Sequence, residues 1–347
     1  MDRVLRVVVV DDSAYVRKAV REILSRSPFL EVVGTARNGV EALVMVEELD
    51  PDVVTCDLVM PEMDGVAFVS AQMARRAVPI VVMSVIDGAG AQVLQALEAG
   101  AVDFVQKPTR LATERILDIS AELIAKVKAA AGAPRQRLTL RPASMDAAPI
   151  APARARAPRF DVVVIGISTG GPQALRQMIP LLPAGCPVGI AIVLHMPVGY
   201  TGLYAEKLDE ISAVKVLEVT EGQALEPGVV WIAPAGHHLA FRRDVDGQVR
   251  AHLSAEPTDA PHRPSVDVLF RSAAEVFGAR SLGVVMTGMG SDGREGSAWI
   301  KTKGGTVLTE SETTCVVYGM PRSVMEAGLS DSSVPLERMA RAIMERL

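Results

Sequence analysis

The stretch VVVIGISTGGPQALRQMIPLL, residues Val162 to Leu182, decides the fold that we predict for the second half of the chain. Its apolar run breaks at Gly166 and resumes as a helical pattern begun by Pro172, which predicts a strand, a sharp turn and a helix. The turn presents Ser168 between glycines, beside the free amide hydrogens that begin the next helix. Ser168 is therefore a candidate nucleophile, although so short a motif is also typical of a plain tight turn or of a phosphate cradle.

The remainder of the second half continues the alternation of strands and helices. Strands are predicted at Asp161–Ile165, Val188–Leu194, Lys215–Val219, Val229–Ile232 and Leu282–Met286, and helices at Ser265–Phe277 and Leu336–Leu347. The segment Leu239–Leu253 centres on Asp246-Gly247, a turn typical of hairpins. We therefore expect residues 160–347 to form a Rossmann-like α/β domain with a parallel sheet and a β-hairpin.

The first half shows the same alternation in a more regular form. Five short, valine-rich strands are predicted at Leu5–Val10, Val32–Ala36, Val53–Cys56, Ile80–Met83 and Val102–Val105, with helical patterns between them. This predicts a flavodoxin-like, doubly wound parallel sheet over residues 1–128, with strand order 2-1-3-4-5. Residues 129–159 are rich in alanine, proline and arginine, with Asp146 as their only acid, which predicts a flexible linker between the two domains.

Composition narrows the class of protein. A chain of 347 residues with 49% hydrophobic residues and a net charge of −5 is typical of a soluble protein of two domains. We expect no membrane insertion, because no apolar run reaches the roughly 18 residues of a membrane span. We expect a cytoplasmic location, because Met1-Asp2-Arg3 begins a charged strand pattern and not a signal peptide. The three scattered cysteines favour buried thiols over disulfides or zinc ligands, and basic residues interleaved with acids disfavour nucleic-acid binding.

Two further polar residues of the second half follow predicted strands. His195 ends the strand Val188–Leu194, and Asp292 follows Leu282–Met286 through a glycine-rich turn. Because the carboxyl ends of parallel strands share one edge of a sheet, Ser168, His195 and Asp292 are expected to meet as nucleophile, base and orienting acid. The alternatives are a packed histidine, an aspartate that caps the helix after it, and a dinucleotide site, which the lack of acids from Val162 to Ala205 disfavours.

Polar residues also follow the predicted strands of the first half. Asp11 and Asp12 follow the first strand, Asp57 the third, Ser84 the fourth and Lys107 the fifth. Three carboxylates at one edge repel one another unless a cation neutralises them, and oxygen ligands of this kind suit Mg²⁺. The lysine and the hydroxyl would complete a site for a phosphoryl group, although each acid could instead cap a helix or a turn.

These segments of the first half, Val8–Ser13, Cys56–Gly65, Ser84 and Lys107-Pro108, resemble a response-regulator receiver domain. The resemblance implies phosphorylation by a chemotaxis histidine kinase. By that resemblance the phosphate acceptor is Asp57, the Mg²⁺ ligands are Asp11, Asp12, Asp57 and the carbonyl of Val59, and the phosphoryl contacts are Ser84 and Lys107. Receivers usually carry a polar side chain where Val59 stands, so we expect an unusual lifetime for the phosphate.

The second half resembles the chemotaxis protein-glutamate methylesterase family, whose members have the order receiver, linker, esterase. The motifs that carry the resemblance are Ile165–Pro172, His195–Pro197, Ala233–Leu239, His262–Phe270, Thr287–Gly293 and Cys315–Pro321. Its departures are Ile167, where alanine is usual, and Thr309–Glu312, which varies a Gln-Asp-Glu-like stretch; neither includes a predicted catalytic residue.

This second resemblance implies a phosphorylation-regulated serine hydrolase. It would remove methyl groups from glutamate methyl esters of methyl-accepting chemoreceptors and deamidate receptor glutamines, with no cofactor for the esterase reaction. Amides near Thr169 and Met289 are candidates for the oxyanion hole, and the unphosphorylated receiver is expected to obstruct the cleft at Ser168. The rival interpretations are a receiver fused to a receptor-binding module without chemistry, or to a DNA-binding output.

Overall fold

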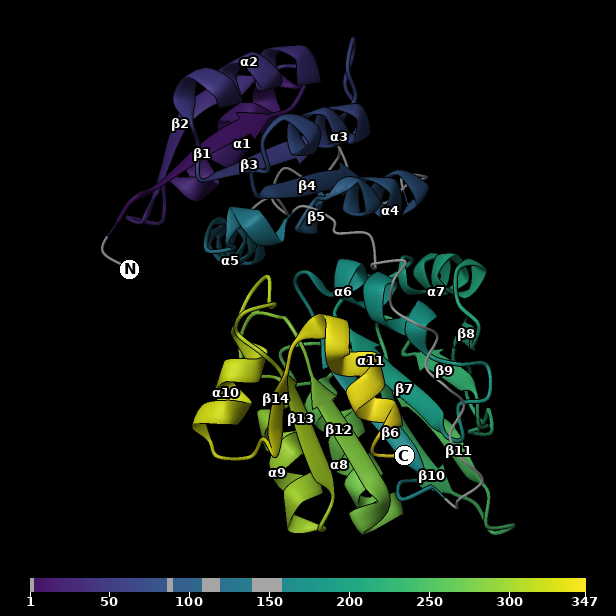
Figure 1. Cartoon of the computed structure of the whole chain (residues 1–347). Helices are drawn as coiled ribbons and strands as arrows, with labels where there is room; N and C mark the ends of the chain where they lie inside the picture. The colour runs from purple at the N-terminus through teal and green to yellow at the C-terminus, as the bar shows by residue number, and fades with distance from the viewer. Residues whose placement is uncertain (1–2, 86–89, 108–118, 139–157) are drawn as a thin grey trace. The chain divides into compact units, whose positions relative to one another are not determined.

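The computed structural model describes residues 3–85, 90–107, 119–138 and 158–347. The chain divides into two compact units, Met1–Leu140 and Arg141–Leu347, and each is a separate α/β layer structure (Figure 1). Within the described ranges, no helix combines the length and the apolar character that crossing a bilayer would require.

The first unit is built on a five-stranded parallel sheet in the order β2-β1-β3-β4-β5. Its strands are β1 Leu5–Val10, β2 Leu30–Ala36, β3 Val53–Asp57, β4 Ile80–Val85 and β5 Asp103–Lys107, and its helices are α1 Ala14–Leu24, α2 Gly39–Leu49, α3 Gly65–Arg75, α4 Gly90–Ala99 and α5 Ser120–Ala131. Helix α1 packs beside α5, and α3 packs between α2 and α4 (Figure 1). The predicted fold class and strand order are confirmed.

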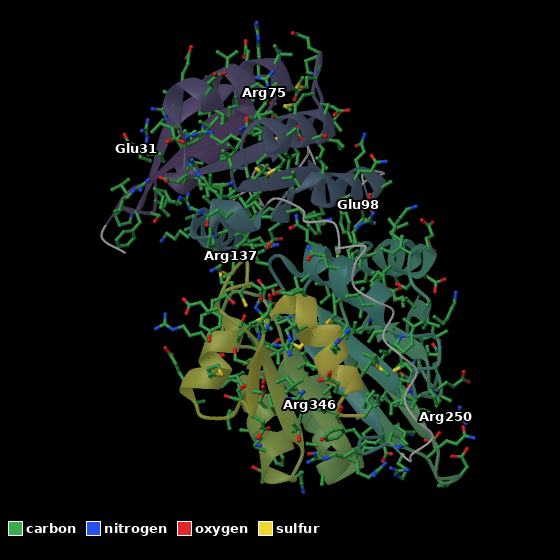
Figure 2. All side chains as sticks on the ribbon, viewed as in Figure 1. Glu31, Arg75, Glu98, Arg137, Arg250 and Arg346 are labelled. Carbon is green, nitrogen blue, oxygen red and sulfur yellow. The ribbon has the colours of Figure 1, made fainter. Side chains whose placement is uncertain are left out.

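Charged side chains cover the outside of this unit. Glu31 lies exposed on the edge strand β2, and Arg75 lies exposed at the end of α3 (Figure 2). Charge on an edge strand discourages pairing with another chain, so the sheet stops at β2 without a cap.

Residues 129–138 differ from the prediction of a flexible linker. Helix α5 continues to Ala131, a 3₁₀ turn follows at Arg135–Arg137, and Ala130 and Leu138 are buried. The guanidinium of Arg135 donates to Asp50 at 3.0 Å and to the carbonyl of Pro51 at 2.8 Å. Small alanines that suggested flexibility here allow close packing on the first unit. The remainder of the predicted linker, up to residue 157, lies outside the described residues.

The second unit is built on a seven-stranded parallel sheet in the order β14-β13-β12-β6-β7-β9-β8. Its strands are β6 Val162–Ile167, β7 Gly189–Leu194, β8 Lys215–Glu218, β9 Val229–Ile232, β12 Ser281–Val285, β13 Thr306–Glu310 and β14 Ser332–Val334. The predicted hairpin is β10 His238–Arg243 with β11 Val249–Ser254. Sequence patterns missed β13 and β14, because the first ends in an acid and the second has only three residues.

The helices of this unit are α6 Gly171–Met178, α7 Thr201–Glu210, α8 Val266–Phe277, α9 Arg294–Thr302, α10 Met320–Glu326 and α11 Leu336–Met344. Helix α8 packs against α9, the hairpin and β6, and α6 packs against α11. Every residue of β6 and β7 is buried, as expected for central strands covered on both faces. Helix α8 approaches β6 closely at Gly166, because a Cβ there would lie 2.2 Å from Cγ1 of Val266.

Replacing Gly166 with alanine should therefore destabilise the second unit. The added methyl group overlaps Val266, and relieving the overlap must move the first turn of α8, at a cost of about 1–3 kcal/mol in the free energy of unfolding. Both tryptophans, Trp231 and Trp299, belong to this unit, so their fluorescence during urea unfolding measures the change. Gly185→Ala is the control, because a Cβ there meets nothing within 4 Å. Equal unfolding curves for the two variants would contradict the packing described here.

Candidate functional site

The three predicted catalytic residues lie on adjacent strand ends of the second sheet. Ser168 follows β6 in a turn closed by Gly170, whose φ of 78° favours glycine. His195 follows the neighbouring strand β7, and its amide donates to the carbonyl of Ile167 at 3.2 Å. Thr287, which leads into the loop that carries Asp292, accepts the amide of Ser168 at 2.9 Å. The segments that carry Ser168, His195 and Asp292 thus lie together at the carboxyl edge of the sheet.

His195 and Asp292 are in direct contact. Nε2 of His195 lies 2.9 Å from Oδ2 of Asp292, and the two side chains are only 9% and 4% exposed. An ionised carboxylate only accepts, so this contact assigns the proton of the neutral imidazole to Nε2. Nδ1 is buried and finds no hydrogen-bond partner within the described part of the chain. The ring therefore presents a free lone pair, held in orientation, which is what a general base requires.

Asp292 has a complete set of hydrogen-bond donors. Besides His195, it accepts the Ser265 hydroxyl at 3.0 Å and the amides of Val266 at 2.8 Å and Asp267 at 2.9 Å. Burial alone would raise the pKa of Asp292, but the hydrogen bond and charge of His195 and the two amides outweigh it and hold this pKa below its ordinary value. Asp292 does cap a helix, as one alternative suggested, but the helix is α8 and not α9, which follows it in sequence.

Asp267 caps the other helix in return. Its Oδ1 accepts the amides of Gly293 at 2.9 Å and Gly296 at 2.7 Å, at the start of α9. Asp292 therefore caps α8 and Asp267, in α8, caps α9, an arrangement that we call the cap exchange. Two acids this close cannot both ionise without cost, and burial together with the charge of Asp292 raises the pKa of Asp267 to about 7.

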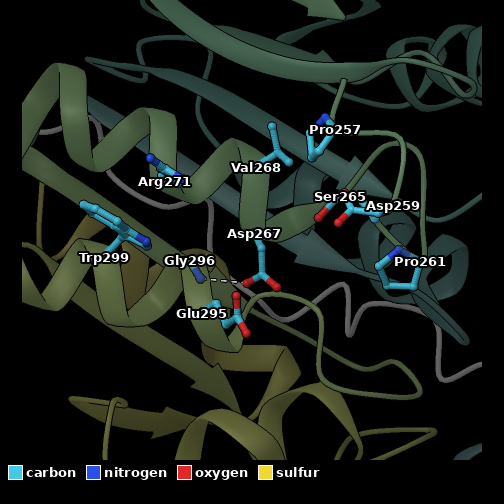
Figure 3. Close-up of a pocket in the computed structure, with 11 residues that line it drawn as sticks. Pro257, Asp259, Pro261, Ser265, Asp267, Val268, Arg271, Glu295, Gly296 and Trp299 are labelled. Carbon is cyan, nitrogen blue, oxygen red and sulfur yellow. Dashed lines mark hydrogen bonds between the residues drawn. The ribbon is translucent and has the colours of Figure 1, made fainter. Parts of the chain in front are cut away.

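A pocket of about 320 Å³ opens beside this exchange. Asp267 and Ser265 line it, together with Glu295 and Trp299, and Figure 3 shows the hydrogen bond from the Gly296 amide to Asp267 at its wall. The guanidinium of Arg271 lies 4.7 Å from the ring centre of Trp299 on the same wall. The pocket exposes one side of Asp267 to solvent, so protons can reach it while Asp292 behind it stays buried.

The two oxyanion candidates lie around Ser168. Thr169, which directly follows Ser168, is 3% exposed, and Met289, which directly follows Gly288, is half-buried. Gly288 brings the two loops together: a Cβ there would lie 2.7 Å from the Cβ of Ser168. Only glycine fits this approach.

The predicted cluster of the first unit also assembles. One carboxylate oxygen from each of Asp11, Asp12 and Asp57 can be chosen so that all lie within 4.8 Å of one another. Nζ of Lys107 contacts Oδ2 of Asp11 and lies 2.9 Å from Oδ2 of Asp57. Ser84 is 2% exposed at the end of the neighbouring strand β4, whereas the side chain of Val59 is 59% exposed.

Electrostatics at this cluster favour a cation. Burial raises the pKa of Asp11, Lys107 counteracts that effect, and the charge of Asp57 raises the pKa further. Lys107 supplies one positive charge for three carboxylates, so the set still carries excess negative charge. Carboxylate oxygens at this spacing are the hard ligands that Mg²⁺ takes in proteins, and the residues present fit that ion.

Sequence patterns did not reveal several residues that support the carboxyl edge of the sheet around Ser168. The ring of His262 stacks on His195 with centres 4.1 Å apart and planes 25° apart. Ser265 and Asp267 hold Asp292 and α9, and Thr287 and Glu310 support the turn of Ser168. All lie within or beside the motifs noted above, but only tertiary contacts reveal their partners.

Comparison with known proteins agrees with this geometry. The family model described as CheB methylesterase matches residues 163–343, and the response regulator receiver domain model matches residues 7–118. A Myxococcus xanthus protein named protein-glutamate methylesterase/protein-glutamine glutaminase 5 is 50% identical over 339 residues, which cover 96% of each chain. A Pyrococcus horikoshii protein of the same name, without the number, is 39% identical over 99% of this chain and 94% of its own. The crystal structure of the Thermotoga maritima CheB methylesterase catalytic domain matches with a TM-score of 0.53 and 40% identity, covering 54% of this chain and 99% of that one.

The cap exchange predicts a pH-dependent effect of Asp267→Asn. Because the folded pKa of Asp267 is raised above its ordinary value, the wild type loses stability as the pH rises through about 7. The uncharged asparagine keeps an acceptor for the two amides. Between pH 5 and pH 8 the free energy of unfolding of the variant should therefore rise by roughly 1–3 kcal/mol relative to the wild type, allowing for solvent screening at a half-buried site. Urea unfolding at each pH measures this. The exposed pocket residue Asp259, replaced by asparagine, is the control, and a difference independent of pH would refute the effect.

Proposed function

Because this chain belongs to the CheB methylesterase family and carries a response regulator receiver domain, we propose that it is a phosphorylation-regulated serine hydrolase acting on chemoreceptors. Family membership makes it a protein-glutamate methylesterase/protein-glutamine glutaminase. The substrates we propose are glutamate methyl esters, and certain glutamines, on the helical cytoplasmic part of the receptors. In this proposal residues 1–138 are the phospho-acceptor domain and residues 160–347 the catalytic domain.

We propose Ser168, His195 and Asp292 as the catalytic residues. Ser168 Oγ attacks the ester carbonyl while Nδ1 of His195 takes its proton, and Asp292 stabilises the imidazolium through Nε2. His195 then protonates the departing methanol, and water hydrolyses the acyl-enzyme by the same route in reverse. The observation that carries this proposal is the buried bond between His195 and Asp292, which leaves Nδ1 without a partner.

The tetrahedral intermediates need donors for their oxyanion. We propose the amides of Thr169 and Met289, one from each of the two loops that meet at Gly288. The close approach of these loops supports the assignment, because donors that are already fixed stabilise a developing charge without reorganising during the reaction.

For the first domain we propose Asp57 as the phosphate acceptor from a histidine kinase. Asp11, Asp12, Asp57 and the carbonyl of Val59 would hold Mg²⁺, which supplies neutralising charge at the phosphoryl group. Lys107, which already contacts Asp11 and Asp57, and Ser84 would contact phosphoryl oxygens. Phosphorylation would break the ion pair between Lys107 and the free Asp57 carboxylate, a local change that can shift the surface of the domain.

The regulatory part of the proposal is that the unphosphorylated receiver obstructs the Ser168 cleft. It rests on the presence of both domains in one chain, since an inhibitory domain tethered nearby acts at a high effective concentration.

Ser168→Ala should lower methanol release from methylated receptors by at least about three orders of magnitude, because the nucleophile is lost. Asp57 should still accept phosphate from a small phosphodonor. The matched control is Ser291→Ala, an exposed serine in the loop before Asp292, which should retain activity within a few-fold. Full activity in the Ser168 variant would overturn the assignment of the nucleophile.

Removing the receiver tests the regulation. A fragment of residues 160–347 should release methanol faster than the unphosphorylated full chain, and a phosphodonor should raise the activity of the full chain but not of the Asp57→Asn variant. The measurement is the initial rate with each protein at equal concentration. If the fragment is no faster than the unphosphorylated chain, obstruction by the receiver is wrong.

A further inference from the structure

Glu310 is a buried acid that the proposed mechanism does not use. It is the last residue of β13, at the same carboxyl edge as Ser168, and its side chain is 0% exposed. Its Oε2 accepts the amide of Thr287 at 2.9 Å, and its Oε1 accepts the hydroxyl of Thr314 at 2.9 Å. Both partners are uncharged donors, so this contact set includes no cation to neutralise a negative charge.

Thr287 connects this carboxyl group to the nucleophile. Its carbonyl accepts the amide of Ser168 at 2.9 Å, and its hydroxyl donates to the carbonyl of Thr169 at 3.0 Å and accepts the amide of Val317 at 3.0 Å. The next residue is Gly288, which packs on Ser168. A displacement of Thr287 must therefore reach the Ser168 turn and the Met289 loop together.

Given the proposed hydrolase function, on which this inference rests, we propose that Glu310 is a positioning residue for the reaction at Ser168. Its uncharged side chain holds Thr287, and Thr287 holds the Ser168 turn against the loop that carries the Met289 amide. Glu310 touches no substrate and exchanges no proton with it.

The charge state of Glu310 decides whether this support persists. Burial raises the pKa of Glu310 to about 7. The hydrogen bonds from Thr287, Thr314 and Cys315 lower this pKa but do not outweigh burial, and the negative charge of Glu337 in α11 adds to the rise. The other titratable group in contact is the buried Cys315 thiol, which lies 3.8 Å from the Glu310 carbonyl. The remaining neighbours, Thr287 after β12 and Val334 in β14, carry no charge. Ionisation would place a buried charge where the contact set holds no cation, although the carboxylate would still accept the Thr287 amide. We expect water to enter beside the charge and loosen the packing of Thr287.

The test compares Glu310→Gln with the wild type in the full chain, with a phosphodonor in excess. Glutamine keeps an acceptor for the Thr287 amide and has no charge at any pH. If only the uncharged form supports Ser168, the ratio of variant to wild-type kcat should be near one at pH 6 and about tenfold at pH 8, with KM nearly unchanged. The ratio removes the pH dependence of His195, of the phosphodonor and of the substrate, which both proteins share.

Glu312→Gln is the matched control, because Glu312 is an exposed acid two residues away. Its ratio to the wild type should stay flat across the pH range. A flat ratio for Glu310→Gln would overturn the proposal. So would a rising ratio shared by both variants, since that would be a general effect of charge.

A second measurement separates positioning from stability alone. The free energy of unfolding of Glu310→Gln, followed by tryptophan fluorescence, should rise relative to that of the wild type between pH 5 and pH 8. The reason is that the folded wild type gives up its proton near pH 7. Such a gain with a flat kcat ratio would make Glu310 purely structural and refute the proposal. If neither protein releases methanol, the hydrolase function itself has failed. The rate of Ser168 labelling by a phosphonate then replaces kcat, with the same rising ratio expected and a flat ratio refuting the role of Glu310.

Discussion

The hydrogen bonds around Asp292 set the geometry on which the second unit depends. This carboxylate joins His195, the residue after β7, to the first turn of α8, because it also accepts from Ser265, Val266 and Asp267. Helix α8 in turn rests on Gly166, two residues before Ser168, through Val266. One buried charge thus holds His195, the helix and, through that helix, the strand that leads to Ser168. A neutral side chain at this position would hold neither the imidazole tautomer nor the two amides equally well.

Both units gather acids at the carboxyl edge of a parallel sheet but neutralise them differently. In the first unit Lys107 places a full positive charge between Asp11 and Asp57, and the remaining negative charge is left to a metal ion in our proposal. In the second unit Asp292 relies on amides, a hydroxyl and His195, while Glu310 has only uncharged partners. The histidine and several donors around Asp292 outweigh its burial and lower its pKa, whereas the two uncharged donors of Glu310 do not outweigh burial, and its pKa is raised. The groups around each acid therefore decide its pKa, and the identity of the residue alone does not.

Topology explains why so much could be predicted and where prediction stopped. Ser168, His195 and Asp292, like Asp11, Asp57 and Lys107, follow strands, and the edge of a parallel sheet brings such positions together whatever their spacing in sequence. The segment 129–138 and the strands β13 and β14 were missed because alanine-rich, short or acid-terminated stretches carry little periodic signal. The contacts of Asp267 with Gly293 and of Glu310 with Thr287 join segments more than twenty residues apart, which no local pattern encodes.

The exchanged caps of α8 and α9 also bear on how this site can change during evolution. Asp267, in the first turn of α8, accepts amides at the start of α9, and Asp292, just before α9, accepts amides at the start of α8. Each acid therefore caps the helix beside which the other acid stands. Replacing Asp267 first would free a helix end beside an intact base, and replacing Asp292 first would free both a helix end and the imidazole. The two positions consequently differ in the substitutions they can accept during evolution. Asparagine at position 267 would keep an acceptor for the start of α9, whereas any change at Asp292 disturbs α8 and His195 together.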